Sequence, residues 1–141
     1  MHSRGVRHVF VYGTLRRGEQ SDINLMLPKP VWLGQARLPG LLYDLGNYPG
    51  MVLGQAGLVL GEVYRISADL ERQLDVIEEV WPEPSGEYFK REVTLRLDGP
   101  SSCPAGHALQ CVVYEVAPER LAGKRLIASG DWVQHRLHTL L

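Results

Sequence analysis

A glutamate near the end of a helical stretch is the first residue whose type and position indicate chemistry. Apolar residues recur in residues 68–80 at the i, i+4, i+7 spacing of one helix face: Leu70, Leu74 and Ile77. At about 100° per residue, Glu78 falls at the edge of that face and Glu79 opposite it. Apolar surroundings raise the pKa of a carboxyl toward neutrality, as general acid–base catalysis requires. The plain alternative for Glu78 is a solvated helix carboxylate.

A glycine turn after a short apolar run is the second such feature. Residues 8–12 (HVFVY) are typical of a buried strand, and Gly13 ends it. The N–H groups of Tyr12, Gly13, Thr14 and Leu15 would then converge without strand partners, in a concavity suited to an anion such as a carboxylate. The alternative is an ordinary β-turn with Gly13 at positive φ.

Two tyrosines in later strand patterns are weaker candidates. Tyr88 and Arg91 lie on either side of a strand start in GEYFKREV. An aromatic residue on an edge strand and an arginine with a buried stem would explain them equally well. Tyr114 in CVVYEV has a similar alternative, a core tyrosine with a satisfied hydroxyl.

The elements that must position these residues are mainly strands. Alternating or continuous apolar runs predict strands over residues 8–12, 31–38, 40–45, 58–66, 88–97 and 108–116. Helices are expected over 20–27 and, after an N-cap at Ser67, over 68–80, with a third short helix or irregular structure over 118–129. Pro39-Gly40 and residues 47–50 (NYPG) predict turns, and Gly61 indicates a bulge or a close backbone approach.

This order of elements favours an α+β fold. Regular βαβ alternation is missing, so a doubly wound parallel sheet is not expected. A small mixed β-barrel of about six strands with flanking helices fits best. The length of 141 residues predicts one domain over residues 1–141.

Composition and missing motifs exclude several function classes. Fifteen basic and 16 acidic residues give a net charge of −1, which argues against nucleic acid as a partner. No apolar run is long enough to span a membrane, and the N-terminus does not fit a signal peptide, so we expect a cytoplasmic protein. Phosphate-loop, dinucleotide and nucleophile-elbow motifs are absent from the sequence.

Cysteines and histidines offer no metal site. Cys103 and Cys111 lack metal-type spacing and are expected to be structural or incidental thiols. His135 and His138 lie three residues apart without a carboxylate or thiol at ligand spacing. Together with the missing phosphate-loop and dinucleotide motifs, this spacing leads us to expect neither a metal nor an organic cofactor.

Taken together and in order, these stretches resemble the γ-glutamylcyclotransferase-like family, in its small branch that includes γ-glutamylamine cyclotransferase. The resemblance covers about residues 8–136. It is carried by six segments of the sequence: FVYGTLRRGE, NYPGMV, GEVYRI, LDVIEEV, YFKREV and SGDWVQHR. Any one of them alone would be weak, whereas the set is fairly specific.

The resemblance implies a pocket at one end of a small barrel and the roles of six residues. The family's YG[ST]L loop, here Tyr12 to Leu15, gives N–H groups to the substrate's α-carboxylate. Its proposed acid/base falls on Glu78, and the tyrosine of its Y-x-x-R motif on Tyr88. The implied reaction cyclises a γ-glutamyl amine or amino acid to 5-oxoproline and releases the amine. The loop at residues 79–87 is longer than expected for the family, which affects the register of Tyr88.

Two other function classes remain open at this stage. One is a non-catalytic binding protein for an amino-acid-like ligand on the same fold. The other is an interaction module in which three tryptophans are surface anchors: Trp32, Trp81 and Trp132. Core or pocket-rim packing explains three tryptophans more simply. The sequence indicates neither the amine released nor an oligomeric state.

Overall fold

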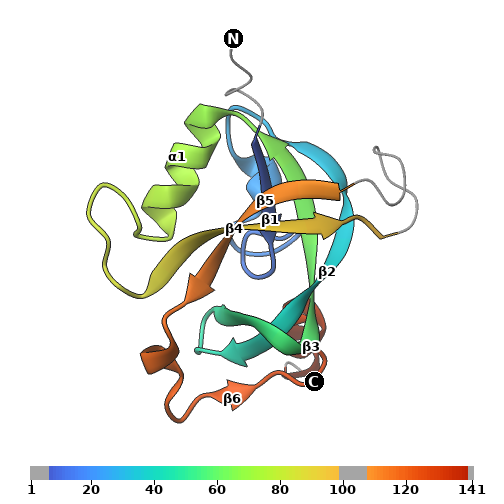
Figure 1. Cartoon of the computed structure of the whole chain (residues 1–141), viewed down its shortest axis with the longest axis vertical. Coiled ribbons are helices and arrows are strands. Elements are labelled where there is room, and N and C mark those ends of the chain that lie inside the picture. Colours follow the sequence, from blue (N-terminus) through green and yellow to red (C-terminus); the bar gives the residue numbers. More distant parts are fainter. Residues whose placement is uncertain (1–6, 99–107, 140–141) are drawn as a thin grey trace.

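The computed structural model describes residues 7–98 and 108–139, which form one mixed sheet with two α-helices (Figure 1). The sheet consists of β1 (Arg7–Val11), β2 (Val31–Asp44), β3 (Pro49–Ile66), β4 (Tyr88–Arg96), β5 (Ala108–Val116) and β6 (Arg125–Leu126). The helices are α1 (Ala68–Ile77) and α2 (Trp132–Thr139), and short 3-10 turns cover Ile23–Leu25 and Pro118–Leu121. Within the described ranges, no helix has the length and apolar character needed to cross a bilayer.

The strands are ordered β4-β5-β1-β3-β2-β6 across the sheet. β1 pairs with β5 in parallel, through Val9 and Val112, and the other neighbouring strands are antiparallel. The sheet curls into a half-barrel, and an isolated bridge between Gln35 of β2 and Asp98 joins its two sides. The predicted fold class, a small mixed barrel with flanking helices, is confirmed in this form.

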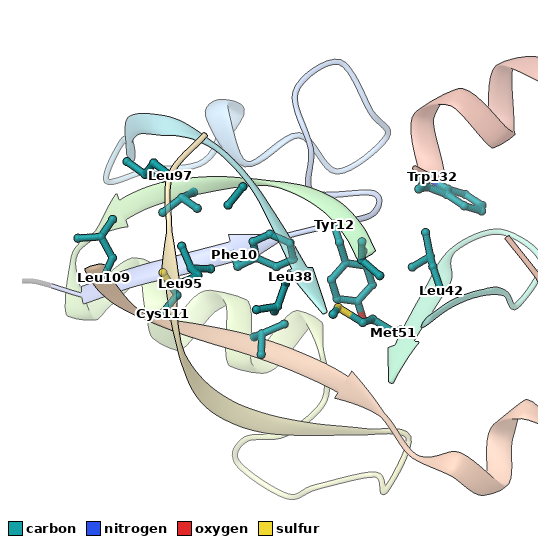
Figure 2. Packing of buried hydrophobic residues seen from close by; sticks show 14 of the residues in the cluster. Phe10, Tyr12, Leu38, Leu42, Met51, Leu95, Leu97, Leu109, Cys111 and Trp132 are labelled. Atoms are coloured by element: carbon teal, nitrogen blue, oxygen red, sulfur yellow. The ribbon is translucent and has the colours of Figure 1, made fainter. Parts of the chain in front are cut away.

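β1 divides the apolar core into two clusters, because successive side chains of a strand point to opposite faces. Val9 and Val11 belong to one cluster, together with the fully buried Leu70 and Leu74 of α1. Phe10 belongs to the other, which Figure 2 shows. Its further members come from most parts of the chain: Leu38, Met51, Leu95, Cys111 and Trp132. Helix α1 is thereby packed against the face of the sheet that carries Val9.

Helix α1 and strand β1 lie side by side. The Ser67 hydroxyl accepts a hydrogen bond from the Leu70 N–H (3.1 Å), which confirms the predicted N-cap. At the start of both elements, Arg7 donates to the Glu71 carboxylate from Nε (2.8 Å). The pairing at this end leaves the last turn of α1 close to the loop that follows β1.

The segments around Pro39 and Pro49 differ from the prediction. Residues 31–44 form one strand rather than two, with a register shift between Pro39 and Gly40. A proline without an N–H is tolerated at such an irregularity, so it does not end the strand. The turn expected at 47–50 is shorter, because Pro49 already pairs with Asp44 and begins β3. Gly61 is a close approach and no bulge, since a Cβ there would lie 2.5 Å from the Phe10 ring.

Three further segments correct the predicted helices. Residues 20–27 contain only the 3-10 turn Ile23–Leu25, because Asp22 accepts hydrogen bonds from Gly18 and Asn24 and so favours turns over a longer helix. Residues 118–129 form another 3-10 turn and the short β6. The helix α2 was not predicted, since its only fully buried apolar anchor is Trp132. The predicted loop at 98–107 lies almost wholly outside the described residues.

Candidate active site

A cavity of about 340 Å³ opens where the loop after β1, the end of α1 and the starts of β3 and β4 meet. All six residues predicted from the sequence line it: Tyr12, Gly13, Thr14, Leu15, Glu78 and Tyr88. They come from segments more than sixty residues apart in the sequence. The fold therefore brings the glycine turn and the helix-end glutamate to the same hollow, and their chemical roles remain predictions.

In the loop after β1, the backbone carbonyl groups of residues 13–15 accept hydrogen bonds, whereas the backbone N–H groups of these residues have no acceptor among the described residues. The carbonyls of Gly13, Thr14 and Leu15 accept hydrogen bonds from the N–H groups of Arg16 (3.0 Å), Ser21 (2.9 Å) and Ile23 (2.9 Å). In the described part of the chain, the N–H groups of those same three loop residues donate to no acceptor. Three fixed donors beside a cavity form a site suited to an anion.

Gly13 is required by crowding and not by its backbone angle. The turn interpretation assigned it a positive φ, but Gly13 is absent from the positive-φ residues of the described chain. Instead, a Cβ at this position would lie 2.6 Å from Cγ of Pro49. The NYPG segment thus packs directly on the glycine turn, and Asn47, Tyr48 and Pro49 also line the cavity.

Glu78 closes helix α1 as its C-cap residue. Its backbone N–H donates to the Leu74 carbonyl (2.9 Å), which fixes the backbone from which the side chain projects. The side chain is partly buried, lines the cavity, and has no hydrogen-bond or ion-pair partner among the described residues. The predicted edge position of Glu78 is therefore correct. Ile77, predicted to be in the core, is instead 48% exposed, because the helix ends there at the cavity wall.

The environment of Glu78 raises its pKa to about 7. The main cause is loss of solvation, followed by repulsion from the carboxylates of Glu87 and Glu79. All three carboxylates line the cavity, and its described lining includes no lysine, arginine or histidine. A carboxyl that titrates near neutrality can both accept and donate a proton at physiological pH.

Three of the four tyrosines that line the cavity are buried and have hydroxyls that are already engaged. Tyr12 donates to the Tyr114 carbonyl (2.6 Å), Tyr88 to the Pro49 carbonyl (2.8 Å), and Tyr114 to the Asp75 carboxylate (2.6 Å). Burial raises the pKa of each of these hydroxyls above its usual value. Their hydroxyls are therefore occupied, whereas the Glu78 carboxyl has no hydrogen-bond partner among the described residues.

Tyr48 and Glu87 are among the cavity residues that were not singled out as functional candidates from the sequence. Tyr48 donates from its hydroxyl to Glu87 (2.7 Å), and the rings of Tyr48 and Tyr88 lie 6.4 Å apart. Glu87 directly precedes Tyr88, so the one available signal was its neighbour. Because both residues lie in or beside proline-rich loops, no periodicity indicated which way they would face.

The remaining predicted residues lie away from the cavity. Arg91 pairs with Glu115 (3.0 Å), and Cys111 is buried with its pKa raised to about 12, which suits a structural thiol. Cys103 lies outside the described residues. His135 contacts Asp44 through Nε2 (2.8 Å), and the described chain contains no group of three or more residues able to hold a metal ion.

The tryptophans do not form a common surface. Trp132 is 3% exposed within the core, and Trp32 packs edge-on against Tyr64 at 5.6 Å between ring centroids. Only Trp81 is largely exposed, at 45%, and the Arg72 guanidinium lies over its ring. The packing interpretation therefore holds for two of the three.

Comparison with known proteins gives consistent matches over most of the chain. The sequence model of the family described as "Gamma-glutamyl cyclotransferase, AIG2-like" matches residues 9–134. The Escherichia coli γ-glutamylcyclotransferase family protein YtfP is 33% identical over 132 residues, which covers 89% of this chain and 95% of YtfP. A Niallia circulans protein named γ-L-glutamyl-butirosin B γ-glutamyl cyclotransferase is 40% identical over 86 residues, covering 60% of this chain and 54% of that protein.

Solved structures agree with these matches. The solution structure of E. coli YtfP has a TM-score of 0.63 and 31% identity, and covers 92% of this chain and 98% of its own. A crystal structure of an AIG2-like protein from mouse has a TM-score of 0.66 and 26% identity, and covers 83% of each chain.

Proposed function

The chain belongs to the AIG2-like γ-glutamyl cyclotransferase family, and from that premise we propose that it converts a γ-glutamyl amine or γ-glutamyl amino acid to 5-oxoproline and a free amine. The observation that carries this proposal is the shared cavity. Glu78, whose carboxyl has a pKa of about 7, lines the same cavity as three residues whose N–H groups have no acceptor in the described chain.

In the proposed reaction the substrate supplies its own nucleophile. The α-nitrogen of the γ-glutamyl group attacks the γ-carbonyl carbon, a C–N bond closes a five-membered ring, and the amide C–N bond to the leaving amine breaks. Because the nucleophile is tethered, the protein's main tasks are to fold the substrate and to move protons. No oxidant or reductant is consumed.

Glu78 would carry the proton from one nitrogen to the other. Its ionised form accepts a proton from the α-ammonium and so makes the attacking amine. Its neutral form then donates that proton to the departing nitrogen, and the second proton lost by the ring nitrogen leaves with the released amine as its ammonium. General acid–base catalysis of this kind contributes about 10²–10⁴-fold to a rate. The N–H groups of Gly13, Thr14 and Leu15 would hold the α-carboxylate, with the tyrosine rings of the cavity around the carbon chain.

The decisive experiment compares Glu78→Gln with the unmodified protein on γ-glutamyl substrates, with 5-oxoproline as the readout. We expect turnover to fall at least about 100-fold, because glutamine cannot exchange a proton. Glu83→Gln is the matched control, since Glu83 is exposed, lies in the next loop and does not line the cavity. Undiminished turnover in Glu78→Gln would remove Glu78 from the mechanism. Binding of γ-glutamyl compounds without any turnover by the unmodified protein would favour a binding protein instead.

A further inference from the structure

Two of the segments that carry the family resemblance, and the end of a third, contribute nothing to the cavity lining. RRGE at 16–19, GEVYRI at 61–66 and SGDWVQHR at 129–136 supply no residue to the described cavity wall. In the folded chain they meet at one ionic network instead. Arg16 donates from Nε to Glu62 (3.1 Å) and from Nη1 to Asp131 (2.9 Å).

Glu62 is the centre of this network. Its carboxylate accepts from the Arg16 guanidinium, from the Arg17 N–H (2.9 Å) and from the Tyr64 hydroxyl (2.9 Å). Glu62 is 5% exposed and Arg16 is 6% exposed, so the pair is almost wholly removed from water. Such a carboxylate holds the backbone at Arg17 and the side chain at Arg16 simultaneously.

A second pair fixes the end of the same segment. Arg136 of α2 donates to both carboxylate oxygens of Glu19, from Nε at 2.8 Å and from Nη2 at 2.7 Å. The Glu19 N–H in turn donates to the Arg16 carbonyl (3.0 Å). The two pairs therefore hold residues 16–19 from both β3 and α2.

The network acts directly on the loop with the open amides. The Arg16 N–H donates to the Gly13 carbonyl (3.0 Å), so Thr14 and Leu15 lie within a single turn that ends at Arg16. Fixing Arg16 fixes the direction of the N–H groups on that turn. A displacement of about 1 Å at a positioning element can reduce a rate by about 100-fold.

A gain in folding stability does not by itself explain why a buried ion pair, Glu62 with Arg16, lies here. Buried ion pairs are often no better for stability than well-packed apolar residues of similar volume, because both charges lose their hydration. A carboxylate that accepts hydrogen bonds from three donors fixes the positions of those donors relative to one another. We propose that Glu62, through Arg16 and the Arg17 amide, is a positioning residue for recognition of the substrate's α-carboxylate. This inference rests on the proposed function.

The test measures how strongly the protein prefers a carboxylate. A γ-glutamyl anilide and its α-carboxamide analogue differ only in the group that the loop amides would bind, and aniline release reports turnover of both. In Glu62→Gln we expect the ratio of kcat/KM for carboxylate over carboxamide to fall about tenfold or more, mainly through KM of the carboxylate substrate. The kcat/KM for the carboxamide substrate should change much less in the same variant.

If Glu62 has only a structural role, Glu62→Gln should lower kcat/KM for both substrates by the same factor. The ratio would then be unchanged, and that result would overturn the proposal. Leu95→Ala is the control for lost stability, because Leu95 is buried on β4 away from the cavity lining. If Glu62→Gln does not fold, Asp131→Asn removes a less buried partner of Arg16, and the ratio should fall in the same direction.

Failure of the proposed function is distinguishable from failure of this inference. If the unmodified protein turns over neither anilide, calorimetry with 5-oxoproline and its carboxamide replaces the rate ratio with a ratio of dissociation constants. A carboxylate preference that falls in Glu62→Gln would then support the inference although the reaction proposal has failed. No preference in the unmodified protein, or a preference that the variant retains, would overturn it.

Discussion

At the scale of single residues, the cavity is distinguished by Glu78, a partly buried carboxyl with no hydrogen-bond or ion-pair partner in the described chain. Other buried or partly buried carboxylates of the described chain are paired, such as Glu62 with Arg16 and Glu71 with Arg7. Among the residues that the structure describes, no cation or hydrogen-bond donor contacts the Glu78 carboxyl, and two neighbouring carboxylates repel its charge. Its folded-state pKa of about 7 lies above the ordinary value of 4.5, so ionising Glu78 above neutral pH destabilises the folded state.

The substitution Glu78→Gln should therefore stabilise the protein, but only where Glu78 is charged. A group with a raised folded pKa binds its proton more tightly in the folded state, so its penalty grows as the pH rises from about 4.5 through 7. We expect Glu78→Gln to raise the free energy of unfolding by about 1–3 kcal/mol at pH 8. At pH 4 the gain should vanish. Urea unfolding of both proteins at the two pH values measures this, and an equal effect at both would contradict the raised pKa.

The neighbouring carboxylate makes a second prediction at this scale. Removing the charge of Glu87 takes away the larger of the two repulsions on Glu78, so the pKa of Glu78 should fall. In Glu87→Gln the acidic limb of the kcat/KM profile should move to lower pH by roughly half a unit. Glu83→Gln, in the same loop but off the cavity wall, should leave the limb in place.

At the scale of elements, the site depends on contact between the ends of two secondary-structure elements: the turn after β1 and the last turn of α1. The helix could be predicted, because a cap at Ser67 and a three-residue apolar stripe agree with each other. Its last turn could not, because the helix ends at Ile77 and not at residue 80, and Ile77, expected on the buried face, is 48% exposed. The turn after β1 could be located but not explained, since the contact between Gly13 and Pro49 joins residues with no local relation.

The elements that failed prediction are fixed by particular contacts, local or distant, that a periodic pattern does not contain. The 3-10 turn at Ile23–Leu25 is held by Asp22, and β2 continues through Pro39 because β3 lies alongside it. Helix α2 depends on a buried Trp132 and on the Arg136–Glu19 pair, and neither has a local sequence signal. Local periodicity carries no information about such partners.

The packing of Pro49 on Gly13 predicts the result of adding one methyl group. Gly13→Ala places a Cβ 2.6 Å from the Pro49 ring, which cannot rotate away. We expect a loss of about 1–3 kcal/mol in the free energy of unfolding and a larger proportional loss of turnover, because the loop amides must shift. Gly54→Ala is the matched control, since a Cβ there meets nothing within 4 Å. Normal activity in Gly13→Ala would show that the loop tolerates displacement.

At the scale of the whole molecule, a nearly neutral chain encloses an acidic cavity. The net charge is −1, whereas the described cavity wall holds Glu78, Glu79 and Glu87 without a basic side chain. The loop amides can accommodate one carboxylate. A second carboxylate, on the leaving amine, would meet the acidic side of the cavity.

The charge of the leaving group should consequently affect kcat/KM. We expect kcat/KM for a γ-glutamyl diamine, whose leaving group carries a further cation, to exceed that for a γ-glutamyl amino acid by about tenfold. The difference should shrink in high salt and in a Glu79→Gln, Glu87→Gln double variant, because both weaken the field of the cavity. Equal rates for the two donors at low salt would argue that the acidic wall does not face the leaving group.

The pairing of β1 with β5 has a practical consequence. Val9 and Val112 stand side by side although about a hundred residues separate them along the chain, and the cavity lies at the end of these two central strands. Losing that pairing would dismantle the binding hollow and the sheet together. A small acid that occupies the hollow should therefore delay heat denaturation of the entire sheet, by an amount that grows with its concentration. Dye-based melting curves over a collection of small acids and amines would rank candidate ligands before any assay of the chemistry exists.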